Sequence, residues 1–227
     1  MSKFYVIGTP IGNLEDITYR AVRVLGEVDL VLCEDTRVTK NLLSKYNIST
    51  PTLSYPSDNQ ATETKFEKIL ALIEEGKTLA LVSDAGTPTI SDPGSVLIAK
   101  IRARFPEMSI EPIPGPSALI TALSASGLAA STFTFLGFLP HKKGRETLFK
   151  EMAESERVII FYESPHRLIK TLESLNKFCP QKRITLAREL TKIFEQIING
   201  QASELLVYFD KHPDKIRGEF VIILADK

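Results

Sequence analysis

The residues best placed for chemistry lie in one stretch, residues 79–94, with the sequence LALVSDAGTPTISDPG. Its first four residues form an apolar run that predicts a buried strand. Small and turn-forming residues follow at 83–88. Residues 91–93 then combine a helix-capping Ser or Asp with a proline suited to the first helical position. Since open α/β sheets bind ligands at the carboxyl ends of their strands, the sequence predicts a ligand-binding loop here, with a plain surface loop as the alternative.

Two further turns have the same character. Residues 8–13 (GTPIGN) follow the strand-like run 4–7, and residues 114–118 (PGPSA) follow the run 110–113. In the second turn Gly115 lets a ligand approach the backbone, and free N–H groups at the next helix could hold a carboxylate or a ribose oxygen. The first turn is neither a dinucleotide fingerprint nor a P-loop, because position 10 is proline and no Lys-Ser/Thr pair follows its second glycine. It remains a predicted ligand-facing turn.

Charged clusters follow three other predicted strands. They are residues 34–37 (EDTR), 163–167 (ESPHR) and 188–192 (RELTK). The first cluster offers a general base, with a helix cap at Asp35 as the alternative. The other two offer phosphate contacts. A serine hydrolase is disfavoured because the chain contains no G-x-S-x-G motif.

The hydrophobic pattern of the first half alternates strands and helices. It predicts strands at 4–7, 28–33, 52–55, 79–82 and 110–113, and helices at 18–26, 39–46, 62–75, 93–104 and 119–125. In the first helix Ala21, Val22 and Leu25 are expected on the buried face. This alternation implies right-handed βαβ units and a largely parallel sheet.

The second half places its strands more densely, which predicts a mixed sheet. Strands are predicted at 132–136, 157–162, 184–187, 194–198 and 218–225, and helices at 145–153, 165–178 and 202–209. The strand at 218–225 is expected to close this sheet. The predicted fold class is therefore α/β, with an N-terminal α/β domain at 1–115 and a C-terminal α/β domain at 116–227.

Composition limits the partners. The 28 basic and 28 acidic side chains balance over 227 residues, so a nucleic-acid partner must meet a local basic patch. Cys33 and Cys179 are far apart in sequence and are expected in the core of a protein from a reducing compartment. Neither Cys nor His residues have the spacing of a metal site. No apolar run is long enough for a membrane span or a signal peptide, so a cytoplasmic protein without a membrane partner is predicted.

Taken in order, these motifs resemble the ribosomal RNA small subunit methyltransferase I group of the tetrapyrrole methylase superfamily. The matching motifs are GTPIGNLEDIT, EDTR, VSDAGTPTISDPG, PIPGPSA, GFLP, YESPHR, ARELTK and GEFVI. The resemblance implies two α/β domains with S-adenosylmethionine in the cleft between them, usually in a homodimer. It also implies 2′-O-methylation of a cytidine in 16S rRNA of the small ribosomal subunit. Methylation of a small tetrapyrrole and a non-catalytic nucleotide-binding module are the alternatives.

This sequence matches some of the family's cofactor-binding motifs and departs from others. Where tetrapyrrole methylases place a Gly-Gly-Asp-Pro type loop, this chain has Ala85-Gly86-Thr87-Pro88 with Asp84 beside it. Where relatives have proline in a G-x-G-P-G turn, this chain has Ile11, which favours the RNA branch. The implied cofactor contacts are Gly8, Ile11, Asp84, Ala85, Gly86, Thr87, Ile90, Ser117, Ala118, Tyr162, Glu163, Leu190 and Thr191.

The implied reaction is attack of a ribose 2′-oxygen on a sulfonium methyl group, which needs orientation and no metal. A base helps because a ribose hydroxyl is weakly acidic. The unranked base candidates are Glu34, Asp84, Asp92 and Glu163. The predicted RNA phosphate contacts are Arg37, Lys142, Lys143, Arg145, Arg167, Arg188 and Lys192.

Overall fold

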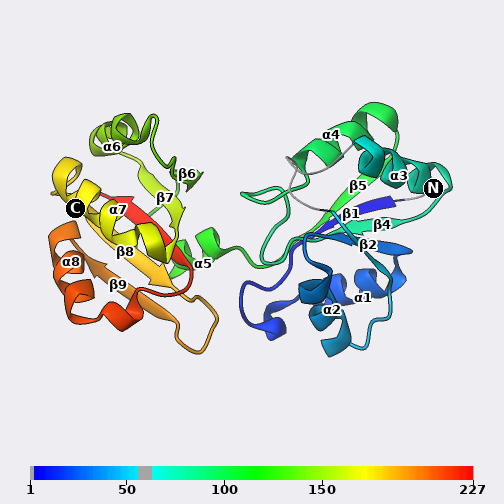
Figure 1. Ribbon diagram of the computed structural model, residues 1–227, viewed down its shortest axis with the longest axis horizontal. Helices are drawn as coiled ribbons and strands as arrows, with labels where there is room; N and C mark the ends of the chain where they lie inside the picture. The colour runs from blue at the N-terminus through cyan, green and yellow to red at the C-terminus, as the bar shows by residue number, and fades with distance from the viewer. Residues whose placement is uncertain (1–2, 56–62, 227) are drawn as a thin grey trace. The chain divides into compact units, whose positions relative to one another are not determined.

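A computed structural model describes residues 3–55 and 63–226 of the chain (Figure 1). The chain divides into two compact units, and it passes from the first to the second between Ser117 and Ala118. Within the described residues, each unit contains one five-stranded sheet. This arrangement confirms the α/β fold class.

The first unit is built on a parallel sheet. Its strands are β1 (Lys3–Ile7), β2 (Leu30–Cys33), β3 (Thr52–Ser54), β4 (Leu79–Leu81) and β5 (Ser109–Ile113). Its helices are α1 (Tyr19–Glu27), α2 (Thr36–Lys45), α3 (Glu63–Glu74) and α4 (Ser95–Arg104), with a short 3₁₀ helix η1 (Leu14–Asp16). The order is β3-β2-β4-β1-β5, and every neighbouring pair is parallel, as predicted. Thr62, where the third helix was expected to begin, lies outside the described residues.

Helices cover both faces of this sheet, with α1 and α2 on one face and α3 and α4 on the other (Figure 1). Burial on both faces explains why β4 is apolar at every position. On α1 the buried residues are Ala21, Val24 and Leu25, whereas Val22 is half-buried. Val24 is buried together with Ala21 because buried positions on a helix recur three and four residues apart.

The predicted start of α4 is wrong. Pro93 is not the first residue of α4, and neither Ser91 nor Asp92 is its N-cap residue, because α4 begins at Ser95 with Gly94 as the N-cap residue. Gly94 has φ 122°, which only glycine adopts readily, and a Cβ there would lie 2.6 Å from the Leu81 side chain. The close passage of the backbone over β4 therefore requires glycine at the N-cap position of this helix.

The second unit contains the mixed sheet. Its strands are β6 (Phe133–Phe138), β7 (Val158–Glu163), β8 (Arg183–Arg188), β9 (Gln196–Gly200) and β10 (Phe220–Ala225). Its helices are α5 (Ala118–Ala125), α6 (Arg145–Glu154), α7 (Pro165–Phe178) and α8 (Ala202–Lys211), with the 3₁₀ helix η2 (Pro213–Lys215). The order is β6-β7-β10-β8-β9; β6 and β7 are parallel, and the other neighbouring pairs are antiparallel.

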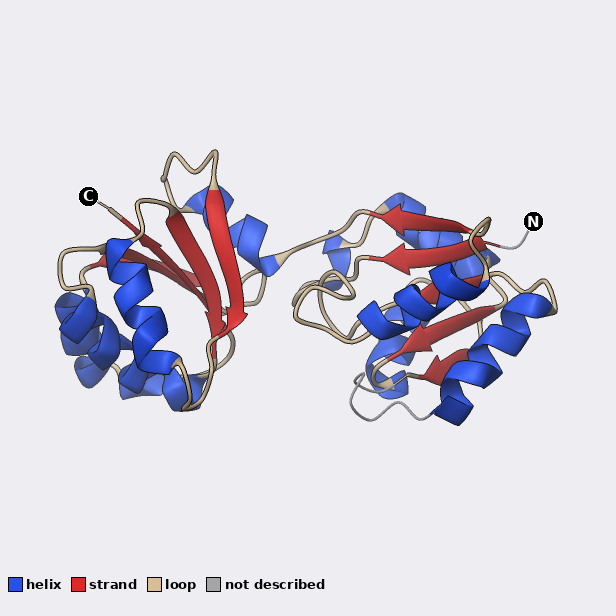
Figure 2. Ribbon diagram, turned by 90° about the horizontal axis from the view of Figure 1, so that it is seen from above, coloured by secondary structure: helices blue, strands red, loops and turns tan. Residues whose placement is uncertain are grey.

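The sequence analysis expected the last strand to close this sheet, but β10 does not lie at an edge. Instead β10 lies in its centre, between β7 and β8, and all six of its residues are buried. A strand that is apolar at every position is typical of the centre of a sheet. Figure 2 shows α6, α7 and α8 on one face of the sheet, where they pack over Phe161 and Phe220.

Both cysteines are core residues, as predicted. The free thiols of Cys33 and Cys179 are buried, each in the core of a different unit. Burial raises the pKa of the Cys179 thiol to about 11. At neutral pH this thiol is therefore an uncharged packing group.

The backbones that follow β1 and β5 touch at Gly8 and Gly115. A Cβ on Gly115 would lie 2.7 Å from the Gly8 carbonyl oxygen. We predict that Gly115→Ala lowers the free energy of unfolding by about 1–3 kcal/mol, because two packed backbones must separate. The matched control is Gly26→Ala in α1, where a Cβ meets nothing within 4 Å; this change should raise stability by up to about 1 kcal/mol. Urea unfolding measures both, and equal effects would contradict the close approach.

Candidate functional site

Three of the predicted ligand turns meet at the carboxyl edge of the first unit's sheet. Thr9 and Gly86 form a two-way backbone bridge, with Thr9 N donating to Gly86 O at 2.8 Å and Gly86 N to Thr9 O at 3.1 Å. The Thr9 hydroxyl also donates to Ser83 O at 3.1 Å. Gly8 N donates to Ile113 O at 3.0 Å. The turn after β1 is thereby tied both to the loop after β4 and to the end of β5.

The loop after β4 contains strained backbone. Thr89 and Ser91 have φ of 75° and 61°, a region that costs roughly 1–3 kcal/mol for a residue other than glycine. Ile90, between them, is 46% exposed although it is apolar. Gly86 has φ 85°, and a Cβ there would sit 3.5 Å from Ile11. Strained residues flanking an exposed apolar side chain are typical of a loop held in shape for a ligand.

The acidic cluster after β2 lies beside this loop. Asp84 accepts a hydrogen bond from the Asp35 backbone N–H at 3.0 Å. The Asp35 side chain accepts from Arg37 N at 2.8 Å and so caps α2, which confirms the capping alternative. It also pairs with the Arg37 guanidinium at 2.6 Å, and these contacts lower the pKa of Asp35 to about 2. Asp35 is thereby committed to the start of α2.

Glu34 differs from its neighbour. Its pKa is raised above that of an ordinary glutamate by partial burial and by the negative charges of Asp84 and Asp35. No residue in the described part of the chain donates a hydrogen bond to its carboxylate, and the residue is exposed. Of the acids at this edge, Glu34 is therefore the one whose carboxylate is most available to another molecule.

The remaining candidates of the first unit take less part in this network. Asp92 is half-buried in the bend that precedes α4. Thr87 accepts a hydrogen bond from Ile90 N at 3.3 Å, and Ala85 is exposed. Ser117 ends the first unit, and Ala118 is the first residue of α5 in the second unit.

In the second unit Glu163 is an internal counter-ion. Its side chain is fully buried and accepts hydrogen bonds from Ser164 N at 2.8 Å and from the Thr171 hydroxyl at 2.6 Å. Its oxygens also lie 3.2 Å from Arg167 Nε and 3.9 Å from Arg145 Nη2. A carboxylate so fully engaged inside its own unit serves structure better than proton transfer.

The predicted phosphate contacts fall into two groups. Four are engaged within the second unit: Arg145, Arg167, Arg188 and Lys192. Arg188 is buried and donates to Lys215 O at 3.1 Å, whereas Lys192 bridges Glu189 and Glu219 at 3.0 and 2.8 Å. The exposed group is Arg37, Lys142 and Lys143, of which Arg37 is already ion-paired with Asp35. An RNA phosphate therefore has freest access to this exposed group.

The turn after β8 is a second strained segment. Glu189 and Thr191 have φ of 49° and 64°, and Leu190 between them is buried. Gly218 has φ 81°, which glycine adopts most readily, and a Cβ there would displace the Glu189 carboxylate. Sequence analysis did not single out Gly218, although this residue opens the GEFVI motif. It did not single out Thr9 either, which forms the backbone bridge to Gly86.

Tyr162, a predicted cofactor contact on β7, lies in an aromatic group. Its ring centroid is 5.0 and 5.5 Å from those of Phe135 and Phe138.

Within residues 3–55 and 63–226, no group of three His, Cys, Asp or Glu side chains could hold a metal ion. The helices found in these same residues are too short or too polar to cross a membrane.

The sequence matches the family model of tetrapyrrole (corrin/porphyrin) methylases over residues 3–206. It is 45% identical over 227 residues to ribosomal RNA small subunit methyltransferase I of Thermotoga maritima, covering 100% of both chains. It is 47% identical over 229 residues to the protein of that name from a Synechocystis species, covering 99% of this chain and 79% of the relative. The chain belongs to the ribosomal RNA small subunit methyltransferase I family of tetrapyrrole methylases. The resemblance drawn from the motifs is confirmed.

Solved structures agree on the fold of this methyltransferase family. The methyltransferase CobJ superposes with a TM-score of 0.70 at 20% identity, covering 100% of this chain and 95% of that one. Uroporphyrin-III C-methyl transferase from Thermus thermophilus, complexed with S-adenyl homocysteine, gives 0.66 at 17% identity, covering 99% and 97%. At such identities the likeness concerns the fold alone.

The structural role of Glu163 is testable. We predict that Glu163→Gln lowers the free energy of unfolding by roughly 3 kcal/mol, because it leaves two poorly exposed guanidinium groups without their counter-ion. The control is Glu156→Gln, an exposed site in the same unit that should change stability by less than about 0.5 kcal/mol. Chemical denaturation compares the two, and an unchanged Glu163→Gln protein would refute the counter-ion role.

Proposed function

We propose that this chain transfers a methyl group from S-adenosylmethionine to the ribose 2′-oxygen of a cytidine in 16S rRNA of the small ribosomal subunit. The observation that carries the proposal is identity of 42–47%, over 97% or more of the chain, to relatives named ribosomal RNA small subunit methyltransferase I. The two solved methyltransferases described above reach only 17–20% identity, which gives a small tetrapyrrole substrate much weaker support.

The cofactor is proposed from the family and from one property of the site. A structural neighbour carries S-adenyl homocysteine, the compound left when S-adenosylmethionine has given up its methyl group. In this chain the loop from Asp84 to Ile90 combines strained backbone with an exposed apolar side chain, which suits a small ligand with an aliphatic part. When bound, S-adenosylmethionine supplies an electrophilic sulfonium methyl group. The contacts at Tyr162, Leu190 and Thr191 stay predictions of the resemblance.

Glu34 is the base that the geometry favours among the four candidates. One oxygen of Asp84 already accepts the Asp35 N–H, and Glu163 is engaged by Ser164, Thr171 and two arginines. Glu34 is exposed, and its raised pKa brings it nearer to the operating range of a general base. In the proposed step the 2′-hydroxyl proton moves to a Glu34 oxygen while the 2′-oxygen–methyl bond forms and the methyl–sulfur bond breaks, with S-adenosylhomocysteine as the leaving group.

The proposed RNA contacts are the exposed cations. Lys142 and Lys143 lie in the loop before α6, and Arg37 lies in the first turn of α2 with 89% of its side chain exposed. Because the whole chain carries no net charge, these local groups must supply the attraction to phosphate. A homodimer and a cytoplasmic location stay predictions of the resemblance.

We predict that assembled small subunits are methylated far faster than a short single-stranded oligomer with the same cytidine. A structured particle offers many phosphates at once, whereas a short strand offers few and loses more entropy, so the rates should differ at least about tenfold. Transfer of a labelled methyl group at physiological salt measures both, with a uroporphyrin-type tetrapyrrole as the third substrate. Label confined to the tetrapyrrole would overturn the proposed function. Equal rates on oligomer and subunit would show that the local site selects the substrate.

We predict that Glu34→Gln lowers kcat by about 10²–10⁴-fold with unchanged cofactor affinity, because it removes the base. The pH dependence gives a sharper result. Activity should rise with pH as Glu34 ionises; because Asp84 raises the pKa of Glu34, Asp84→Asn should move this acid limb of the kcat profile to lower pH. Glu67→Gln on α3 is the exposed control. Full activity of Glu34→Gln, or an acid limb that does not move, would exclude Glu34 as the base.

A further inference from the structure

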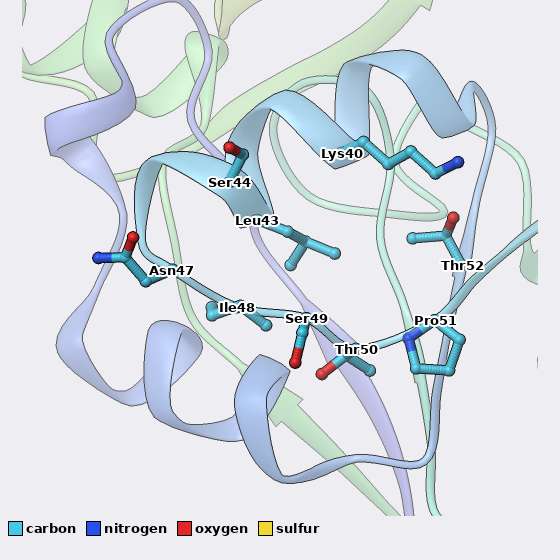
Figure 3. A pocket seen from close by; sticks show the side chains of 9 residues that line it. All are labelled: Lys40, Leu43, Ser44, Asn47, Ile48, Ser49, Thr50, Pro51 and Thr52. Carbon is cyan, nitrogen blue, oxygen red and sulfur yellow. The ribbon is translucent and has the colours of Figure 1, made fainter.

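A cavity of about 540 Å³, more open to solvent than enclosed, lies in the first unit between α2 and the connection from α2 to β3 (Figure 3). None of its lining residues was predicted to take part in the site, and none belongs to the turns that meet at the carboxyl edge of the sheet. Its volume is in the range of pockets that hold small ligands. The cavity therefore requires an explanation of its own.

The wall of the cavity is a fixed chain reversal. Asn47 has φ 55° and donates through its N–H to Ser44 O at 3.1 Å, and Ile48 N donates to Leu43 O at 2.9 Å. This pair of bonds is the Schellman motif that ends many helices. Further along, the Thr50 hydroxyl donates to Leu25 O at 2.6 Å. Because the reversal is fixed at both points, the cavity is present before any ligand arrives.

The lining combines three kinds of group. Leu43 and Ile48 are apolar, and Pro51 adds an exposed ring. Polar side chains, including those of Ser44 and Asn47, also line the cavity, and Figure 3 shows these two pointing away from Leu43 and Ile48 at its margin. Because Leu43 is buried, Ile48 and Pro51 supply most of the apolar surface of this mainly polar lining, and such a mixed surface suits a nucleoside, which has an apolar ring face and many hydrogen-bonding groups.

Lys40 is the charged residue of the lining. Figure 3 shows its side chain extended along the cavity on the side of Thr52. Its ammonium group forms no ion pair with the residues that the structure describes, although twelve such pairs occur elsewhere in them. An unpaired ammonium group favours an anion such as a phosphate.

The cavity also lies along a path from the proposed base. Arg37, Lys40 and Ser44 are spaced three and four residues apart on α2, so they share one face of the helix. This face begins next to the acidic cluster and reaches the cavity after roughly 10 Å, from the rise of a helix. A strand that contacts the acidic edge can therefore continue along α2 into the cavity.

We propose that this cavity is an accessory site for one nucleotide of a single-stranded RNA segment, with its phosphate at Lys40 and its base against Ile48 and Pro51. The inference rests on the proposed function, because it concerns the RNA that the chain methylates. It adds a substrate-binding residue, Lys40, and a place for a nucleotide that is not itself modified.

The test compares Lys40→Ala with Lys68→Ala, which removes the same charge from an exposed position on α3. The affinity of each variant for assembled small subunits is measured as a function of salt, and its affinity for S-adenosylhomocysteine is measured by calorimetry. Lys40→Ala should reduce the slope of log K against log salt by about 0.7–0.9, the effect of one phosphate contact. Lys68→Ala should leave the slope unchanged, and both variants should keep wild-type cofactor affinity.

A second measurement locates the contact. Small subunits containing 4-thiouridine are irradiated with the wild-type protein, and a cross-link within residues 47–52 to RNA supports the proposal. Equal salt slopes for the two variants, or a cross-link there to a ribosomal protein, would overturn the accessory site while methylation by the wild type upholds the proposed function. Failure of the wild type to methylate small-subunit RNA would overturn both.

Discussion

The pair of backbone hydrogen bonds between Thr9 and Gly86 is the contact on which the candidate site depends. It joins two turns that leave neighbouring parallel strands, and it uses the N–H and C=O groups of both residues. The Thr9 hydroxyl adds a bond to the loop after β4. Held in this way, the loop retains strained backbone at Thr89 and Ser91 and presents Ile90 to solvent. Without the bridge, Thr89 and Ser91 would relax toward negative φ, and the conformation of the loop would change.

The carboxylates show how burial divides structure from chemistry. Asp35 caps α2 and Glu163 neutralises two arginines inside the second unit, so both are used by the fold. Glu34 has neither kind of partner, and its pKa is raised by partial burial and by its acidic neighbours. Residue type alone made these acids equal candidates. Their surroundings distinguish Glu34, the proposed base, from Asp35 and Glu163, which stabilise the fold.

Much of the fold follows from the sequence because its strongest signals are local. Apolar runs such as β4 and helical spacing such as that in α7 predict their elements directly, since burial requires those patterns. The start of α4 and the central position of β10 could not be predicted, because they depend on the passage of Gly94 over Leu81 and on strand pairing across the sheet. The same holds for the partner of Arg145 and Arg167, because only the fold brings the buried Glu163 beside these two side chains.

The claim that the loop after β4 receives the cofactor is tested most directly by hydrogen exchange. Amide exchange of the whole chain is measured with and without S-adenosylhomocysteine and is followed by peptide. The account predicts slower exchange in residues 83–92 and in the turn at 8–12, with no change in α3, because a bound ligand covers the loop and restrains its opening. Protection confined to other segments, with the loop exchanging as fast as in the free protein, would contradict it.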